Sequence, residues 1–305
     1  MFSTACLAMP GRLPGGSFIL RLFRTPAGWI GGGITGIVIA MAILAPVVAA
    51  HDPFEQDLTV SGITQPPTRA HVLGTDELGR DVYSRIVYGS RISLFIAGVS
   101  LGLAAAVGIV LGTSAGMVGG PWDHIIIRFT DALLAFPVLI LAVAIAAAAG
   151  RGIAGLILAI ATVNVPVFTR LVRAQCLQLR DREYVVAATA IGAGAYRKIA
   201  RHVLPNLMNT LIVQASVSVS FAIIIEAGLS FLGLGVQAPL PSWGLMIATS
   251  RMHMASSPHM ILAPAAVISL TVLGLNLFGD AVSDALDPRV GHARWRRRWL
   301  RAGTL

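Results

Sequence analysis

Three carboxylates stand close together in the sequence, at Asp76, Glu77 and Asp81, and acidic residues at such short spacing can bind a cation or assist hydrolysis. Their spacing matches no metal-binding loop that we can assign. Arg80 and Arg85 are interspersed among them, and arginine forms strong ion pairs with carboxylates. We therefore expect internal pairing to hold this segment, and we predict no metal site.

Glu226 is the only acidic residue deep inside a long apolar run. Carboxylates within a membrane are rare and often line a polar path, where they contact a substrate amine or relay protons. Alternatively, Glu226 lies near a membrane boundary and holds an outer loop through hydrogen bonds, which is the interpretation we favour. Asn164 and Asn276, in two other apolar runs, are weaker candidates for lining the same path.

Several kinds of chemistry have no matching motif in this chain. The sequence contains no Gly-x-x-x-x-Gly-Lys-Ser/Thr loop for ATP and no Gly-x-Ser-x-Gly elbow for a hydrolase, and His202, His253 and His259 fall near or outside the apolar runs. We expect a non-catalytic chain that binds no cofactor of its own. Cys6 and Cys176 predict no disulfide, and we assign neither a function.

The composition places the chain in a membrane, because 55% of its 305 residues are hydrophobic and only 12% are charged. Roughly 20 apolar residues span a bilayer. The sequence predicts six spanning helices, and hence an all-α polytopic membrane protein. The uncharged or nearly uncharged runs cover residues 27–50, 92–118, 132–150, 152–169, 207–225 (continuing toward 233) and 260–279. Glycines four residues apart, which allow close helix packing, recur at Gly32/Gly36, Gly98/Gly102, Gly108/Gly112 and Gly112/Gly116.

The basic residues predict the orientation. Sixteen of the 23 Lys and Arg fall in the N-terminal tail, between the fourth and fifth runs, or after the sixth, so both termini are expected in the cytoplasm. The net charge of +9 is thereby explained by the membrane and not by nucleic acid. We divide the chain into a tail (1–26), a first helix with an outer amphipathic segment (27–91), a core of five helices (92–289) and a basic tail (290–305).

Two boundary segments carry finer expectations. From Val82 the apolar residues recur at helical spacing, which predicts an amphipathic helix lying on the outer membrane surface. At the entrance to the third run, Arg128 and Asp131 stand three residues apart and are expected to pair along one helix face.

A polar, basic island at 183–206 interrupts the apolar runs. Its small residues predict a short helix from Glu183 to Ile191, a sharp turn at Gly192, and a second basic helix, Tyr196 to His202, that stops at Leu204-Pro205. Such a surface allows another protein to approach closely. The island is therefore a candidate docking segment.

This arrangement resembles the cytoplasmic coupling loop, or EAA loop, of bacterial ABC importer permeases. Ala187, Ala188, Gly192 and Leu204-Pro205 fit that pattern, while Val186 stands where the general motif has Glu. Glu-Tyr-Val-x-Ala-Ala followed by His-x-Leu-Pro-Asn is similar to the dipeptide/oligopeptide/nickel branch. The resemblance implies ATPase contact through Glu183, Tyr184, Ala187, Ala188, Gly192, Ala193, Arg197, His202, Leu204, Pro205 and Asn206.

Three other segments are similar to the C-type permease subunit of that branch, at residues 73–91, 226–244 and 276–289. The resemblance implies an ABC importer type I permease fold in the bacterial inner membrane. It further implies a second homologous permease, two subunits that carry ATP and Mg, and an extracytoplasmic solute-binding protein. Outer residues that could contact that protein are Asp76, Arg80, Asp81 and Trp243, the last expected as an anchor at the membrane interface.

Two questions stay open at this point. An ion-coupled secondary transporter is the alternative function, although the chain has one buried Glu, no evident internal repeat, and a loop that this alternative leaves unexplained. The residues also do not choose among dipeptides, longer peptides, nickel complexes or other small solutes.

Overall fold

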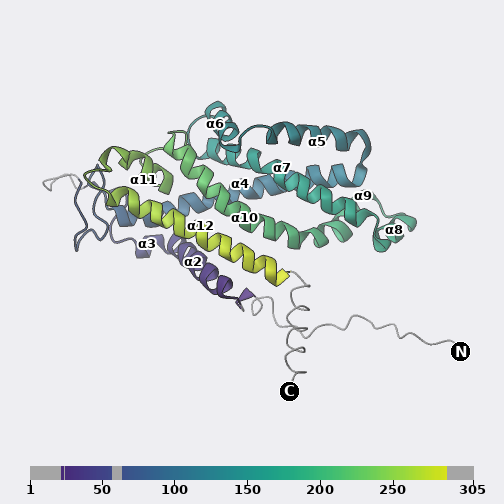
Figure 1. The fold of residues 1–305 in the computed structure, drawn as a ribbon, viewed down its shortest axis with the longest axis horizontal. Coiled ribbons are helices and arrows are strands. Elements are labelled where there is room, and N and C mark those ends of the chain that lie inside the picture. Colours follow the sequence, from purple (N-terminus) through teal and green to yellow (C-terminus); the bar gives the residue numbers. More distant parts are fainter. Residues whose placement is uncertain (1–21, 24, 57–63, 287–305) are drawn as a thin grey trace, which may run out of the picture.

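The computed structural model describes residues 22–23, 25–56 and 64–286, and within these residues the chain is helical without any strand. Cys6, most of the N-terminal tail (1–26) and the whole basic tail (290–305) lie outside this part. The elements are α2 (Pro26–Ile43), α3 (Ala45–Val48), α4 (Val82–Val118), α5 (Gly120–Leu134), α6 (Val138–Ala149), α7 (Ile153–Arg180), α8 (Glu183–Ala190), α9 (Ala195–Lys198), a π-helical turn (Ile199–Val203), α10 (Leu204–Phe231), α11 (Trp243–Ser250), a 3-10 turn (Arg251–His253) and α12 (His259–Leu286). In Figure 1, α8 lies at one end of an elongated bundle, and α11 lies at the other.

Five helices are long and apolar enough to cross a membrane, and α5 with α6 makes a sixth candidate if this bent pair counts as one span. The all-helical membrane fold is thus confirmed. The expected continuous third run at 132–150 is wrong, because α5 and α6 meet at 96° around Phe136-Pro137. Proline has no N–H and disfavours helical conformation in the residue before it, which explains the break at this point.

Ion pairs between helices replace the pair expected within α5. Asp131 pairs with Arg170 of α7, and not with Arg128 as predicted. Asp123, in the first turn of α5, accepts a 2.6 Å hydrogen bond from Arg173 of α7. Both contacts tie α5 to α7, and the two helices run beside one another (Figure 1).

The close packing of α4 against α7 depends on glycines. Methyl groups added at Gly112 and Gly116 would lie 2.6 Å from the Thr169 carbonyl oxygen and 2.5 Å from Cβ of Cys176. Gly108 meets Phe168 in the same way. The four-residue spacing therefore predicted close contact correctly along this stretch.

The other glycine pairs do not pack in this way. A methyl group would meet open space within this chain at Gly36, Gly98 and Gly102, and at Gly32 it would meet the rings of Phe23, at 3.0 Å, and Phe278, at 3.7 Å. Spacing alone therefore did not show which glycine face is in contact.

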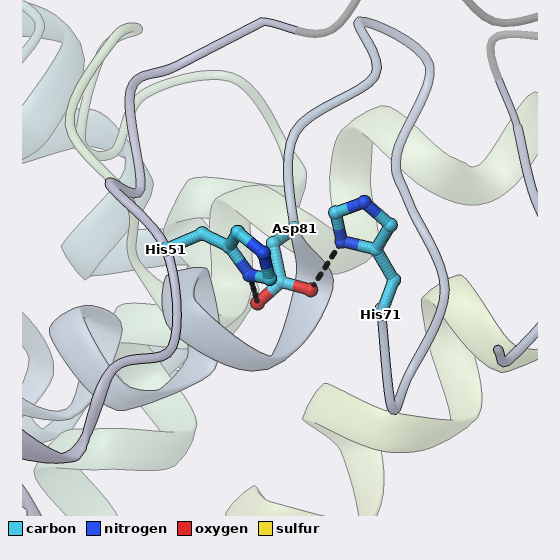
Figure 2. Close-up of side chains that lie close together, drawn as sticks. All are labelled: His51, His71 and Asp81. Carbon is cyan, nitrogen blue, oxygen red and sulfur yellow. Dashed lines mark hydrogen bonds and ion pairs between the residues drawn. The ribbon is translucent and has the colours of Figure 1, made fainter. Parts of the chain in front are cut away.

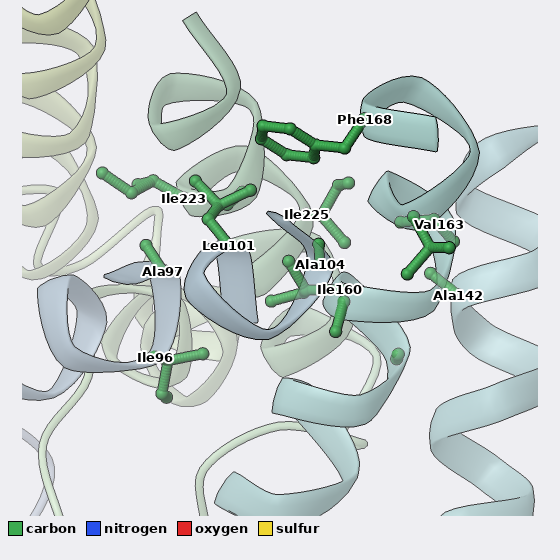
Figure 3. Close-up of a cluster of buried hydrophobic side chains, with 14 of the residues drawn as sticks. Ile96, Ala97, Leu101, Ala104, Ala142, Ile160, Val163, Phe168, Ile223 and Ile225 are labelled. Atoms are coloured by element: carbon green, nitrogen blue, oxygen red, sulfur yellow. The ribbon is translucent and has the colours of Figure 1, made fainter. Parts of the chain in front are cut away.

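The core joins α4, α7 and α10 through large aliphatic side chains (Figure 3). Ile96, Ile160, Phe168 and Ile223 are completely buried there. Large apolar residues also cover the outside of the bundle, as in Phe129, which is 58% exposed. Such a surface fits contact with lipid or with another membrane helix.

The helix α4 begins differently from the prediction. It runs without a break from Val82, and Val82, Ile86 and Val87 are buried in the same turns as Ser84 and Ser90. An amphipathic helix on the membrane surface would expose one polar side, so that expectation is wrong. Other segments pack around this end of α4, since the Pro53 carbonyl contacts Arg85 and the Trp243 indole contacts Ile86.

Candidate functional site

The short helix expected from Glu183 to Ile191 is present as α8, and its end explains Gly192. The backbone N–H of Ala193 donates to Ala188 (2.9 Å) and that of Gly192 donates to Thr189 (3.0 Å), which is a Schellman cap. Gly192 has φ +80°, and nothing lies within 4 Å of where its Cβ would be. Glycine is therefore needed here for its backbone conformation and not because the loop is cramped.

One side of α8 is apolar and exposed. Val185 and Ala188 are buried toward the bundle, whereas Val186 is 54% exposed and Ile191 is 86% exposed. Tyr184 and Tyr196 also face outward. Val186, Ile191 and Tyr196 were not among the predicted contact residues. Large apolar side chains inside a polar island were the signal that could have identified them.

The second part of the island does not stop at proline. The chain continues from α9 through the π-helical turn into α10, so the expected helix end at Leu204-Pro205 is wrong. Pro205 lies in the first turn of α10, where a missing N–H is tolerated. The Asn206 amide donates to the His202 carbonyl at 2.6 Å, and Arg197 is exposed.

The candidates for a substrate path come from three helices and share no hydrogen bond among the described residues. The Glu226 side chain is completely buried, and its two oxygens accept hydrogen bonds from Ser230 (2.9 Å) and Ser93 of α4 (3.2 Å). The Asn164 amide donates to the Ile160 carbonyl at 2.8 Å inside α7, and Asn276 is exposed on α12. The contacts of Glu226 support the structural interpretation, because they join α10 to α4.

The predicted arginine pairing before α4 is confirmed. Asp76 lies 2.7 Å from Nε of Arg80 and 3.3 Å from Nε of Arg85, and all three side chains are buried. Arg85 also donates to the Pro53 carbonyl at 3.1 Å. These residues hold the loop onto α4. Their contact with a binding protein stays a prediction.

Trp243 is completely buried, so the prediction of an anchor at the membrane interface is wrong. Its indole N–H donates to the Ile86 carbonyl of α4 at 3.0 Å. The ring lies against Gly89, where an added methyl group would approach it to 3.1 Å. The first residue of α11 is therefore fixed against α4.

Comparison with known proteins identifies the fold's family. Residues 108–292 match the model of the binding-protein-dependent transport system inner membrane component, and residues 14–67 match the N-terminal transmembrane domain of oligopeptide transport permease C. The chain belongs to this permease family. The permease is thus a multi-pass inner-membrane protein and the permease component of a transport system.

Its relatives resemble the permease over most of their length. A probable D,D-dipeptide transport system permease of Escherichia coli K12 is 40% identical, over 92% of this chain and 93% of its own. A dipeptide transport system permease of Alkalihalophilus pseudofirmus is 43% identical, over 83% and 82%. A glutathione transport system permease of Pectobacterium atrosepticum is 39% identical, over 92% of each chain.

One cluster in the permease was missed by the sequence analysis. His51, His71 and Asp81 meet before α4, with Nδ1 of His71 3.0 Å from one Asp81 oxygen and Nδ1 of His51 3.9 Å from the other (Figure 2). The rings lie with their centroids 4.7 Å apart. The two histidines are 20 positions apart in the sequence, so no local spacing pattern indicated the cluster.

Proposed function

We propose that this permease forms half of the path through which an ATP-driven importer carries short peptides. The named relatives transport a D,D-dipeptide, a dipeptide and glutathione, all of them short peptides or peptide-like. Identities near 40% over most of the chain support the same substrate class here. The complementary half of the path would come from a second permease of the same kind.

The exposed α8 is the observation that carries the proposal. Its apolar outer side, with Val186 and Ile191, is suited to a groove on a cytoplasmic ATPase. Only Asp181 and Arg182 separate α7 from α8, while α9 continues into α10. A displacement of α8 on closure of the ATPase would therefore turn both helices, which is a rigid-body coupling mechanism.

The remaining subunits follow from the same assignment. Two partner subunits would carry ATP and Mg, and a solute-binding protein would deliver substrate to the side opposite α8. Both termini would then lie in the cytoplasm, and the permease itself would carry no catalytic residue. An ion-coupled carrier is less well supported, because both oxygens of Glu226 accept hydrogen bonds from serines.

The test is purification of the tagged chain in mild detergent, with mass spectrometry of its companions, an ATPase assay and uptake of a labelled dipeptide. Gly192→Val should insert normally yet lose ATPase and uptake, because valine strains a backbone at φ +80° and disturbs the end of α8. Gly194→Ala is the matched control, since Gly194 has φ −62° and open space around it.

Normal uptake by Gly192→Val would refute coupling through α8. Purification of the chain alone, with dipeptide transport in ATP-free proteoliposomes, would establish the ion-coupled alternative. Recovery of an ATPase without any uptake of short peptides would support the importer assignment but refute short peptides as the substrate class.

A further inference from the structure

We propose that His51, His71 and Asp81 bind a divalent transition-metal ion, with zinc as the best match to these ligands. The three residues come from three places in the fold: the chain after α3, the loop before α4, and the N-cap of α4. Figure 2 shows the two imidazole rings on either side of the Asp81 carboxylate. A bound ion would therefore join all three segments.

The donor atoms suit such an ion. Imidazole nitrogen with carboxylate oxygen is a common zinc ligand set, and two ligands at about 2.1 Å from a tetrahedral ion lie roughly 3.4 Å apart. Here Nδ1 of His71 lies 3.0 Å from one Asp81 oxygen, and Nδ1 of His51 lies 3.9 Å from the other, so a shared ion also requires a small rotation of the carboxylate. One ligand atom from each residue can be chosen so that all lie within 4.8 Å of one another. Small movements of the two rings would complete the geometry.

Helix capping alone does not account for the cluster. Asp81 caps α4 by accepting from the backbone N–H (2.8 Å) and hydroxyl (2.7 Å) of Ser84 through one oxygen, and this needs neither histidine. Nδ1 of His51 is buried and makes no hydrogen bond. A buried polar atom without a partner is costly, and coordination of an ion by Nδ1 would remove that cost.

The neighbouring charges leave Asp81 available to a cation. The closest arginine in sequence is Arg80, and it pairs with Asp76 and Glu77. Arg85 pairs with Asp76 as well. Among the described residues, the ion-pair partners of Asp81 are the two histidines. Its negative charge is thus directed toward the candidate site.

A cavity adjoins the candidate site on the His51 side. This cavity of about 380 Å³ borders His51 and is lined in part by Pro46, Asp52 and Tyr88. Three protein ligands leave a fourth position of a tetrahedral ion for water. A bound ion would stabilise the loop before α4. This loop lies at the end of the bundle opposite α8 (Figure 1).

The experiment uses the full chain, with any subunits that accompany it, purified through a tag without histidine. After treatment with a chelator, the protein is loaded with zinc, desalted and assayed for metal content and for zinc affinity against a chromophoric chelator. His51→Gln and His71→Gln are the test variants, and Asp81→Asn keeps an oxygen for the cap. His124→Gln, at an exposed histidine of α5, is the matched control.

We expect the wild type and His124→Gln to hold one zinc ion more per chain than the histidine test variants. The test variants should bind zinc at least 100-fold more weakly, which exceeds the ~10- to 100-fold loss typical of changes outside the ligands themselves. X-ray absorption of the loaded wild type should show two imidazole ligands. Zinc should also raise the thermal unfolding midpoint of the wild type and the control only.

Equal zinc content in all variants, or its loss on desalting from the wild type, would overturn the proposal and mark the metal as adventitious. If one histidine variant does not fold, the other decides the outcome. Because the readouts are metal content and stability, they do not depend on uptake or on the identity of the substrate.

Discussion

The contact of Gly112 with α7 predicts a specific loss of stability for Gly112→Ala. The new methyl group would lie 2.6 Å from the Thr169 carbonyl oxygen, and an ordinary contact begins at about 3.4 Å. The obstacle is backbone, so it cannot rotate away. The two helices must separate locally by about 0.8 Å, the difference between these distances.

The size of the effect follows from that separation. A radial gap of about 0.5 to 1 Å removes a quarter to a half of the dispersion energy of each atom pair. Neighbouring contacts at Gly108 and Gly116 would be weakened together with the one at Gly112. Overpacking of this kind costs about 1 to 3 kcal/mol, partly offset by the roughly 1 kcal/mol that alanine gains over glycine in a helix.

Gly102→Ala is the matched control, because Gly102 lies in the same helix and nothing is within 4 Å of its added methyl group. This variant should be unchanged or more stable by up to about 1 kcal/mol. The free energy of unfolding of the isolated chain can be measured by SDS titration in detergent, followed by circular dichroism. Equal stability of the two variants would refute the packing argument.

Substitutions at three further contacts, with matched variants, test them by the same unfolding assay and, for Glu226, by peptide uptake as well. Asp76→Asn should lower the free energy of unfolding by about 3 to 5 kcal/mol, because it leaves buried arginines without their partner. Asp181→Asn, at a side chain 78% exposed, should lower it by less than about 1 kcal/mol. Equal losses would contradict the assigned pairing. Glu226→Gln should keep peptide uptake. Glu226→Leu should lower the free energy of unfolding by about 1 to 3 kcal/mol, because Ser93 and Ser230 lose their acceptor. A stable Gln variant without uptake would instead indicate a role for Glu226 in the substrate path. Trp243→Phe should lower the free energy of unfolding by about 1 kcal/mol, because its hydrogen bond to α4 is lost. Trp122→Phe, at an exposed ring, should change it very little. No difference between the two variants would argue against the contact of Trp243 with α4.

The long helices α2, α4, α7, α10 and α12 were predictable from the sequence because each contains an apolar run bounded by charge or glycine, whereas the bent pair α5 and α6 was not. The short helix α8 was predicted over 183–191 and is observed over 183–190, since its end depends on a local property, the backbone freedom of Gly192. The arginine pairing around Asp76 was also predictable from near neighbours. Local patterns were sufficient wherever the deciding contact lay within a few residues.

The rest depended on contacts between distant segments. Trp243 is buried because α11 packs against a helix that begins 161 positions earlier, at Val82, and nothing in its local sequence indicates this. The ion pair of Asp131 is formed across 39 residues, and the cluster of His51 and His71 across 20. A proline also proved ambiguous: Pro137 marks a sharp break, while Pro205 starts a helix.

The helix α8 is connected to the bundle from both of its ends, so that α8, α7, α4 and α10 form a closed ring of contacts. From α8 the chain reaches α7 through two residues, α7 packs along α4 at the glycines, and α4 is bonded back to α10 through Ser93 and Glu226. The path returns to α8 through the π-helical turn and a capped loop. A displacement of α8 is transmitted in two directions around this ring, through α7 and through α10. The permease should therefore respond to force at α8 by turning as a whole, with little change of shape within itself.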